Sequence, residues 1–200
     1  MPDKKRIALI TGASSGLGRE FARLLAREAV DELWLVARRG ERLRKLSVEL
    51  AVPCCIFVLD LTQEASLEEL SAALAAEPVV VRYLVNAAGF GRIGMAADIG
   101  AATTGRMIAL NCRAAAELTE RALPYMERGS RVLEIASCAA FQPIPYLAAY
   151  AATKAFLLRY SRALAAEVAQ RGITVTAICP YWIRDTEFTQ SIVAQVGLRM

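Results

Sequence analysis

Short apolar runs alternate with longer amphipathic segments along most of the chain. Runs of consecutive apolar residues predict strands at 7–10, 33–36, 56–59, 81–85, 132–136 and 173–178. Apolar residues three or four positions apart predict helices at 16–28, 41–50 and 150–170, another around 67–74, and two between 101 and 126. Strands that are apolar on both faces and alternate with helices indicate a buried parallel sheet. We therefore expect an α/β fold, a doubly wound parallel sheet with helices on both faces.

One apolar stripe is expected to orient the helix at 150–170. Phe156, Tyr160, Leu164 and Val168 recur every four residues, so we expect this stripe to face the core. The Ala-rich stretches at 72–76 and 114–116 fit helices that pack closely.

Composition narrows the classes of protein to which the chain can belong. The 200 residues are 56% hydrophobic and 22% charged, which predicts a single folded domain over 1–200. A net charge of +4 is too balanced to indicate nucleic-acid binding, and no apolar stretch reaches the length of a membrane span. The N-terminus leads straight into a strand, so we expect no signal peptide.

The cysteines and the absence of histidine bear on metals and on the compartment. The five cysteines are odd in number and form no C-x-x-C, and the chain has no His. We therefore expect neither a disulfide framework nor a metal site, and a cytoplasmic location in which the thiols stay reduced.

A glycine-rich segment joins the first predicted strand to the first predicted helix. Residues 11–18 read Thr-Gly-Ala-Ser-Ser-Gly-Leu-Gly. Gly12 permits a tight turn, Gly16 lets the backbone approach a pyrophosphate, and Gly18 allows close packing of helix on strand. Free amides at the helix N-terminus would hold the phosphates. A flexible turn is the alternative, but it does not require three glycines. We therefore predict dinucleotide binding, with contacts from Gly12, Ser14, Ser15, Gly16, Leu17 and Gly18.

The end of the second predicted strand bears on the choice of cofactor. An acidic residue there favours the free 2′-hydroxyl of NAD(H), whereas a basic one accommodates the 2′-phosphate of NADP(H). The strand ends with Arg38 and Arg39 and has no acid. Because arginine binds phosphate well, we predict that NADP(H) is preferred over NAD(H). The alternative is that both arginines are solvated in a loop.

Tyr150 and Lys154 are four residues apart, and Ser137 precedes Tyr150 by thirteen. On a helix, Tyr150 and Lys154 share one face, and the ammonium is expected to lower the pKa of the phenol so that it can exchange a proton. The spacing alone is also common in amphipathic surface helices. The chain lacks His, the usual acid–base residue near neutral pH, which leaves this pair as the candidate.

These motifs, in this order, resemble the short-chain dehydrogenase/reductase family, which has a Rossmann-like fold. The resemblance runs from about Lys5 to Thr186. Segment 11–18 matches T-G-x-x-x-G-x-G, and Tyr150 with Lys154 matches Y-x-x-x-K. Four further matches are the adenine-binding pair Asp60-Leu61, the N-N-A-G turn at Asn86-Ala87-Ala88-Gly89 with Ala in second place, the catalytic Asn at Asn111, and the proline beside the nicotinamide at Pro180.

The resemblance implies roles for the matched residues. Tyr150 would be the general acid in ketone reduction and the base in alcohol oxidation. Lys154 would hold the nicotinamide ribose, Ser137 would bind the substrate oxygen, and Asn111 would support a water that connects Lys154 to solvent. The backbone amide of Ile183 would contact the nicotinamide. The family also implies a homodimer or homotetramer built through the helices at 101–126 and 150–170.

The sequence departs from the family pattern near its end. Pro180 is followed by Tyr181 and Trp182 instead of Gly, and Thr186 lies one residue further from Pro180 than usual. Because the sequence stops at Met200, we expect the usual substrate loop, last helix and seventh strand to be missing or shortened beyond recognition. Either the sequence is a fragment of a longer chain, or the substrate side is unusually open. The residues expected around the substrate are Ser137, Cys138, Ala139, Phe141, Ile144, Tyr146 and Tyr181.

Two functions from different classes remain after the sequence has been read. The first is an NADP(H)-dependent oxidoreductase that acts on a small-molecule carbonyl or secondary alcohol, and the mostly apolar pocket residues favour an apolar substrate. The second is a nucleotide-binding redox sensor or scaffold that uses the same fold without turnover.

Overall fold

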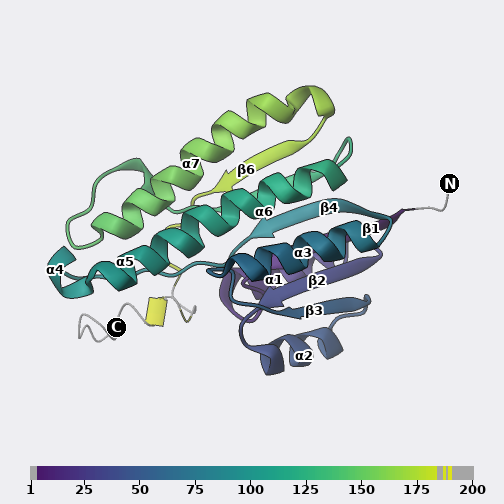
Figure 1. The fold of residues 1–200 in the computed structure, drawn as a ribbon, viewed down its shortest axis with the longest axis horizontal. Helices are drawn as coiled ribbons and strands as arrows, with labels where there is room; N and C mark the ends of the chain where they lie inside the picture. The colour runs from purple at the N-terminus through teal and green to yellow at the C-terminus, as the bar shows by residue number, and fades with distance from the viewer. Residues whose placement is uncertain (1–3, 184–186, 188, 191–200) are drawn as a thin grey trace.

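The computed structural model describes residues 4–183, 187, 189 and 190, and Figure 1 shows its arrangement. Its sheet has six parallel strands in the order β3-β2-β1-β4-β5-β6. All six predicted strands are present, each with ends within two residues of the prediction. Their bounds are β1 Lys5–Thr11, β2 Glu32–Ala37, β3 Cys54–Val58, β4 Val79–Asn86, β5 Arg131–Ile135 and β6 Thr174–Ile178.

Helices cover both faces of the sheet, as predicted. One face carries α1 (Gly16–Leu25) and α2 (Gly40–Glu49), and the other carries α3 (Glu64–Ala76), α6 (Ala115–Ala122) and α7 (Ala148–Val168). The strand order reverses direction after β3, and right-handed crossovers therefore place the later helices on the opposite face. The doubly wound α/β fold is confirmed.

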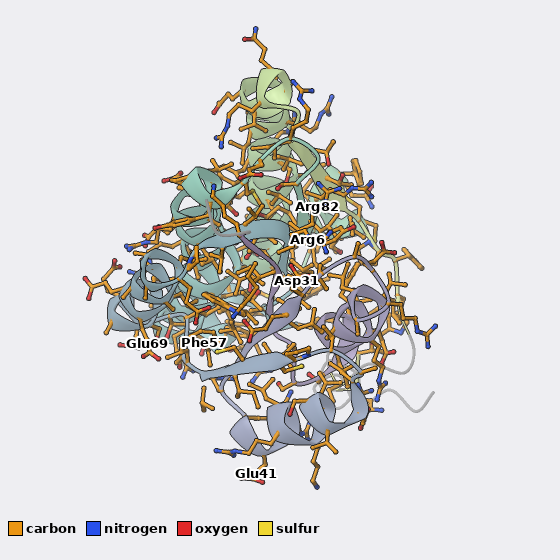
Figure 2. All side chains as sticks on the ribbon, turned by 90° about the vertical axis from the view of Figure 1, so that its right-hand side faces the viewer. Arg6, Asp31, Glu41, Phe57, Glu69 and Arg82 are labelled. Atoms are coloured by element: carbon orange, nitrogen blue, oxygen red, sulfur yellow. The ribbon has the colours of Figure 1, made fainter. Side chains whose placement is uncertain are left out.

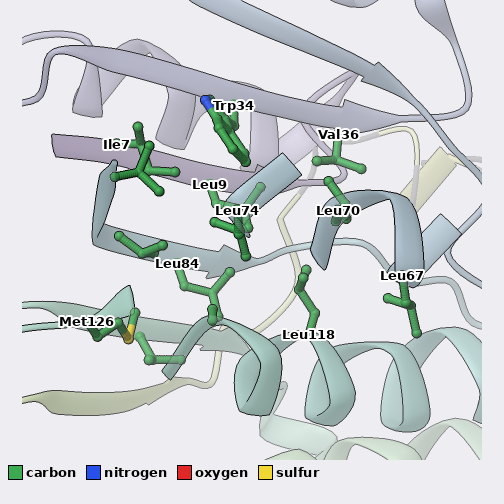
Figure 3. Close-up of a cluster of buried hydrophobic side chains, with 14 of the residues drawn as sticks. Ile7, Leu9, Trp34, Val36, Leu67, Leu70, Leu74, Leu84, Leu118 and Met126 are labelled. Carbon is green, nitrogen blue, oxygen red and sulfur yellow. The ribbon is translucent and has the colours of Figure 1, made fainter. Parts of the chain in front are cut away.

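Alternating residues of each central strand supply two separate cores. Ile7 and Leu9 of β1 pack toward α3 and α6, whereas Ala8 and Ile10 pack toward α1 and α2. Figure 3 shows the first of these cores, where Leu67, Leu70 and Leu74 of α3 meet the strands. The predicted core-facing part of this helix, 67–74, is therefore confirmed.

The stretch between 101 and 126 is more continuous than the two helices predicted for it. α5 (Ala101–Ile108) runs directly into a π-helical segment, η1 (Ala109–Ala114), which runs into α6 and then into the short 3₁₀ segment η2 (Leu123–Tyr125). In Figure 1, α5 and α6 lie along one long helical rod. The π segment inserts an extra residue in a turn, which changes the direction of the side chains that it carries.

The predicted stripe on α7 is partly wrong. Leu164 and Val168 are buried, but Phe156 is 42% exposed and stacks on Tyr160 with ring centroids 5.8 Å apart. Residues four apart advance by about 40° more than a full helical turn, so a stripe with this spacing drifts off one face within three steps. Six of the buried residues alternate spacings of four and three instead: Tyr150, Lys154, Leu157, Ser161, Leu164 and Val168, and Ala151 and Thr153 are buried beside them.

Short segments complete the described fold. They are α4 (Ala96–Ile99), which the sequence did not predict, and the 3₁₀ turns η3 (Cys138–Phe141) and η4 (Ala169–Arg171). At the amino end of the sheet, the Arg6 guanidinium donates a hydrogen bond of 3.1 Å to Asp31, which connects β1 to the turn before β2 (Figure 2).

Three further sequence expectations concern the cysteines, a membrane span and the end of the chain. All five cysteines carry free thiols, and Cys112 is the buried one. Within the described ranges, no helix is both long and apolar enough to cross a membrane. The expected loss of a substrate loop, a helix and a seventh strand concerns the chain after Thr186, which lies outside the described residues except for 187, 189 and 190.

Candidate active site

A cavity of about 640 Å³ opens at the carboxyl ends of the strands. Ligands of doubly wound sheets bind at this edge, where the strand order reverses, and here that point lies between β1 and β4. Most of the predicted site residues line this cavity. They are Gly12, Ser14, Ser15, Gly16, Leu17, Arg38, Arg39, Asp60, Leu61, Ala87, Gly89, Ser137, Cys138, Tyr150, Lys154, Pro180, Tyr181 and Ile183.

The glycine loop forms a cradle that side chains could not enter. Gly12 has φ +67°, and a Cβ added there would lie 2.8 Å from the backbone nitrogen of Ala88. Gly16 also has a positive φ, of +52°. A Cβ on Gly18 would meet the Gly12 carbonyl carbon at 2.7 Å, so Gly18 serves the packing of α1 on the loop and does not itself line the cavity. These close approaches leave the loop amides accessible to phosphate.

Thr11 fixes the loop against the turn after β4. Its hydroxyl accepts hydrogen bonds from the amides of Ala87 (3.0 Å) and Ala88 (3.1 Å). The turn that resembles N-N-A-G is therefore held to the glycine loop by one side chain. Both turns line the cavity, and this contact holds them next to each other.

Asn86 lies beneath this turn and not in the cavity. Its side-chain amide donates hydrogen bonds to the hydroxyl of Thr119 (2.8 Å) and to the carboxyl of Glu134 (2.7 Å). Glu134 is fully buried on β5, and burial raises the pKa of its carboxyl to about 7. The sequence reading missed Glu134. The available signal was an acidic residue inside an apolar strand, because buried carboxyls are rare.

Ser137 and Tyr150 meet at the other end of the cavity. The Ser137 hydroxyl oxygen accepts a hydrogen bond of 3.1 Å from the amide of Ala139, and its hydroxyl also hydrogen-bonds the phenol of Tyr150. Burial raises the Tyr150 pKa above its ordinary value, and the hydrogen bond with Ser137 offsets only part of that rise. The prediction that Lys154 lowers the Tyr150 pKa is therefore wrong for this structure.

Lys154 is directed toward β5 and not toward the phenol oxygen. Its ammonium donates a hydrogen bond of 2.6 Å to the carbonyl of Ile135 and lies 5.8 Å from the centre of the Tyr150 ring. Burial lowers the Lys154 pKa to about 8, against the opposing effect of the Glu134 carboxyl. Because this amine is so deeply buried, small changes in its surroundings decide whether it carries a charge.

Asn111 lies on the π-helical segment η1, behind the cavity wall. Its side-chain oxygen accepts from the amide of Phe90 (3.0 Å), and its nitrogen donates to the Phe90 carbonyl (2.9 Å) and to the hydroxyl of Thr153 (3.1 Å). Both amide protons are thus in use. The side chain holds the backbone at Phe90, and a Cβ on Gly89 would lie 3.1 Å from its oxygen. The water proposed at Asn111 stays a prediction.

The two arginines after β2 differ in their contacts. Arg39 donates hydrogen bonds to the hydroxyls of Ser14 (3.1 Å) and Ser15 (2.6 Å), so it is connected to the glycine loop. Arg38 is mostly exposed and lies 4.0 Å from Asp60. The Glu187 carboxylate pairs with Arg39 at 2.6 Å and also with Arg42. The sequence reading missed Arg42 and Glu187.

Asp60 follows β3 on the wall where the family binds adenine. Its carboxylate accepts hydrogen bonds from the amide (3.0 Å) and hydroxyl (2.8 Å) of Thr62. Burial acts to raise the Asp60 pKa, but the Thr62 hydrogen bonds and the charge of Arg38 outweigh it and leave the pKa lowered. The Asp60 side chain is therefore a carboxylate held in place by Thr62, and it orients the turn after β3.

Two predicted substrate residues lie away from the cavity. Phe141 is 68% exposed, and Tyr146 instead lines a separate hollow of about 280 Å³ beside Met95 and Ile99. Tyr146 also has φ +65°, in the left-handed region that residues other than glycine rarely adopt. Ala139 and Ile144 do line the cavity, as do Phe90, Leu110 and Trp182, which the site prediction did not include. Thr186 lies outside the described residues.

Within the described ranges, no cluster of His, Cys, Asp or Glu side chains is suited to hold a metal ion. The hydroxyls of Ser137 and Tyr150 and the amine of Lys154 are polar groups that line the cavity and can exchange protons. Ser137 lies just after β5, at the start of η3, and Tyr150 and Lys154 lie one turn apart on α7.

Known proteins share both the sequence pattern and the fold. A family model described as short chain dehydrogenase matches residues 6–197. A short-chain dehydrogenase from Sphingobium yanoikuyae in complex with NADPH is 32% identical, with a TM-score of 0.85 over 98% of this chain and 78% of that one. A 3-ketoacyl-(acyl-carrier-protein) reductase from Brucella melitensis complexed with NADH is 28% identical, with a TM-score of 0.84 over 96% and 81%.

A third similar solved structure is named for the ketones on which that protein acts. The bulky-bulky ketone specific alcohol dehydrogenase from Comamonas testosteroni is 32% identical, with a TM-score of 0.80 over 89% of this chain and 73% of that one. The family model spans nearly the whole chain, and the sheet order, glycine loop and Ser–Tyr–Lys set agree with it. The chain therefore belongs to the short-chain dehydrogenase family of oxidoreductases.

Proposed function

We propose that the protein is an NADP(H)-dependent oxidoreductase that interconverts a small-molecule ketone and its secondary alcohol, with Tyr150 as the general acid and base. The observation that carries the proposal is the meeting of the Ser137 and Tyr150 side chains in the cavity whose other end is the glycine loop. A carbonyl oxygen placed between these two hydroxyls could receive a hydrogen bond from one and a proton from the other.

The electrostatics favour Tyr150 as a proton donor. Burial raises its pKa, so the phenol keeps its proton at neutral pH. Ketone reduction needs such an acid, because negative charge develops on the substrate oxygen as the carbonyl carbon is reduced. Ser137 would stabilise that charge, and the Lys154 ammonium would be the source of the proton that returns to Tyr150 after each reduction. The reverse reaction would use the same residues with the proton moving the other way.

The residues around the loop fit a dinucleotide cofactor. A Cβ would fill the space at Gly12, and the loop amides lie at the N-terminus of α1. When bound, the nicotinamide would supply or accept the hydride. Asp60 and Leu61 would contact the adenine, and Lys154 would hold the nicotinamide ribose. Pro180 and Ile183 line the cavity on the side where the nicotinamide would lie.

A preference for NADP(H) is supported by Arg39. Its guanidinium is positioned between the two loop serines, and its other edge holds a carboxylate, that of Glu187. A group that binds a carboxylate in this geometry is suited to a 2′-phosphate. The similar structures include complexes with NADPH and with NADH, so the preference rests on this chain's own arginines.

The cavity wall around the proposed reaction centre is largely apolar. Cys138, Ala139, Ile144 and Tyr181 contribute to it. This lining supports an apolar ketone as substrate, in keeping with the bulky ketones named for the Comamonas enzyme.

The first experiment is to incubate the purified protein with NADPH and a panel of apolar and polar ketones while following NADPH absorbance. We expect consumption of NADPH with at least one bulky apolar ketone, and slower consumption of NADH under the same conditions. Binding of NADPH without consumption across the whole panel would contradict an enzyme and favour a redox sensor or scaffold of the same fold.

Assembly and location follow from the surface and from the thiols. We propose a homodimer or homotetramer formed through α5 and α7, because Ile108 and Phe156 on these helices are about half exposed. Sedimentation velocity would measure the assembly, and a monomer at micromolar concentration would contradict it.

We propose a cytoplasmic location for a single-domain protein, supported by five free thiols. Fluorescence of a tagged protein in the cell would test the location.

A further inference from the structure

Glu134 is a buried carboxyl that the proposed chemistry does not use. It lies on β5 with no exposed surface, level with Asn86 on β4 and with Ala177 on β6. Its side chain points into the layer formed by α6 and α7, because it lies on the same side of β5 as Val132 and Ala136. A carboxyl in this position is costly unless something in the structure compensates for its burial.

The four shortest hydrogen bonds around Glu134 contain one more proton than an ionised carboxyl allows. These four contacts are Asn86 to Thr119 (2.8 Å), Asn86 to Glu134 (2.7 Å), Thr119 to the Ala115 carbonyl (2.8 Å) and Thr119 to Glu134 (2.9 Å), while a fifth contact, from Asn86 to the Ala115 carbonyl, is longer at 3.3 Å. The Asn86 amide supplies two protons and the Thr119 hydroxyl supplies one. A neutral Glu134 supplies the fourth, so that each of the four shortest contacts contains one hydrogen.

The second carboxyl oxygen of Glu134 points to the same protonation state. This oxygen, Oε2, is buried and has no hydrogen-bond partner within the described part of the chain, and neither has the side-chain oxygen of Asn86. A bare oxygen of a buried carboxylate would carry negative charge without compensation, whereas the carbonyl oxygen of a neutral acid tolerates that position far better. Burial also raises the Glu134 pKa to about 7, against the Asn86 and Thr119 hydrogen bonds and the charge of Lys154.

Glu134 is connected to the proposed reaction centre in two ways. Through Asn86 it supports the turn whose amides bond to Thr11 beside the glycine loop. Through the next residue, Ile135, its strand accepts the hydrogen bond of the Lys154 ammonium. Lys154 is also the charged group that acts on Glu134, and Tyr160 on the same helix experiences the Glu134 charge. β4 and α6 contact the Glu134 carboxyl through Asn86 and Thr119, whose side chains do not titrate.

We propose that Glu134 is a positioning residue held as a neutral carboxylic acid beneath the active site, and that its ionisation strengthens the positive charge on Lys154. The neutral form completes the hydrogen bonds that hold the turn after β4. The ionised form places a negative charge near Lys154, which favours the ammonium over the free amine. The two groups therefore titrate as a pair in the range where the enzyme works. The second half of this inference rests on the proposed function, and the first half does not.

Glu134→Gln tests the neutral acid without any assay of activity. Glutamine has nearly the same shape and cannot ionise. Consider an acid whose pKa is higher in the folded protein than in the unfolded protein. Its contribution to the stability of the folded state is fully present below the unfolded pKa and is lost as the pH rises through the folded pKa. The thermal unfolding midpoints of the wild type and of Glu134→Gln should therefore be compared as a function of pH. Between about pH 4.5 and 7 the wild-type midpoint should fall relative to that of the variant, and above that range the two curves should be parallel. Parallel curves over that whole range would overturn the proposal.

Glu69→Gln is the matched control, because it makes the same chemical change on the exposed side of α3 (Figure 2). Its unfolding midpoint should follow the wild type across the pH range. If Glu134→Gln does not fold, the wild-type protein labelled with ¹³C at glutamate carboxyls replaces it. A carboxyl carbon that titrates near pH 7 supports the proposal, and the absence of any glutamate titrating above pH 6 overturns it.

The connection to Lys154 is tested by the pH profile of ketone reduction. Glu134→Gln removes the negative charge that favours the Lys154 ammonium, so the alkaline fall in kcat/KM should move to lower pH. If the variant folds and its kcat/KM falls at the same alkaline pH as that of the wild type, the proposed effect of Glu134 on Lys154 is overturned. The proposal that Glu134 is a neutral acid is not affected by that result. If the protein reduces no ketone at all, the proposed function fails, while the unfolding curves still decide whether Glu134 is a neutral acid.

Discussion

The Lys154 ammonium and the carbonyl oxygen of Ile135 are joined by a hydrogen bond of 2.6 Å. This bond fixes the amine of α7 to the last residue of β5, one position after Glu134. The strand therefore provides both the oxygen that binds Lys154 and the carboxyl that acts on its charge. The proposed proton chemistry depends on a strand whose side chains lie outside the cavity, with the exception of Ile135.

The first prediction concerns the alkaline side of the pH profile. Burial lowers the Lys154 pKa to about 8, so above that pH the group loses its charge. We expect kcat/KM for ketone reduction to fall above about pH 8, by up to tenfold per pH unit. Steady-state rates between pH 6 and 10 would measure it. A profile that is flat over this range, in protein shown by circular dichroism to be folded, would contradict the assignment.

The second prediction concerns Tyr150→Phe. Removing the hydroxyl takes away the proposed acid but leaves the ring that packs in the cavity wall. We expect NADPH affinity to stay within a few-fold of the wild type while turnover falls by about 10²–10⁴-fold. Fluorescence titration and NADPH consumption would measure the two quantities separately.

Tyr160→Phe is the control for that change. Tyr160 is on the same helix, and its hydroxyl donates a hydrogen bond of 3.3 Å to the Ala116 carbonyl, away from the cavity. This variant should keep near-native turnover. Equal losses in the two variants would show that the effect comes from packing of α7, and near-native turnover of Tyr150→Phe would eliminate the mechanism.

The third prediction compares two glycines. Gly12→Ala forces a side chain into a positive φ and against the backbone of Ala87 and Ala88. We expect it to lower the free energy of unfolding by about 2 kcal/mol or more and to abolish cofactor binding. Gly105→Ala, in α5 with nothing within 4 Å, should raise the free energy of unfolding by about 0.5–1 kcal/mol. Denaturant unfolding of both variants measures the contrast, and the same sign for both would contradict it.

The fourth prediction concerns the carboxylate that occupies Arg39. Glu187 pairs with Arg39 and Arg42, on the side of the cavity proposed for the 2′-phosphate. Glu187→Gln should strengthen NADPH binding by about two- to fivefold, because ion pairs this exposed contribute up to about 1 kcal/mol. NADH binding should not change. Glu41→Gln, which breaks the nearby pair with Arg44, is the control. Weaker NADPH binding in Glu187→Gln would mean that Glu187 supports the site.

The sequence predicts the sheet, the glycine loop and the Ser–Tyr–Lys set because each is encoded locally. Six strands follow from apolar runs, and the loop follows from three glycines at a strand–helix junction. The distinction between Arg38 and Arg39 could not be predicted, because it depends on which guanidinium reaches Ser14 and Ser15 across the fold. Two adjacent residues of the same type carry no sequence signal that separates them.

Other features depend on the environment and not on residue type. The Tyr150 pKa is set by burial against a hydrogen bond from Ser137, and a helical spacing reveals neither. The partners of Glu134 come from β4 and α6, which are distant in the sequence. The spacing of four residues predicts Phe156 in the core together with Leu164 and Val168. Phe156 lies off the buried face because residues with that spacing drift around the helix. Tyr146 is exposed and has a positive φ, and no local sequence pattern marks either property.

The pairing of β1 with β4 also bears on how the protein is made. β1 and its loop leave the ribosome before the turn bonded to Thr11, which follows only after two further strand–helix units. A nascent chain therefore carries the loop for some time without the turn that packs against it. Sheets that depend on such distant pairings fold slowly, since a long segment must be closed before any contact forms. The cofactor would therefore stabilise the finished sheet, and it could not rescue a chain interrupted before β4.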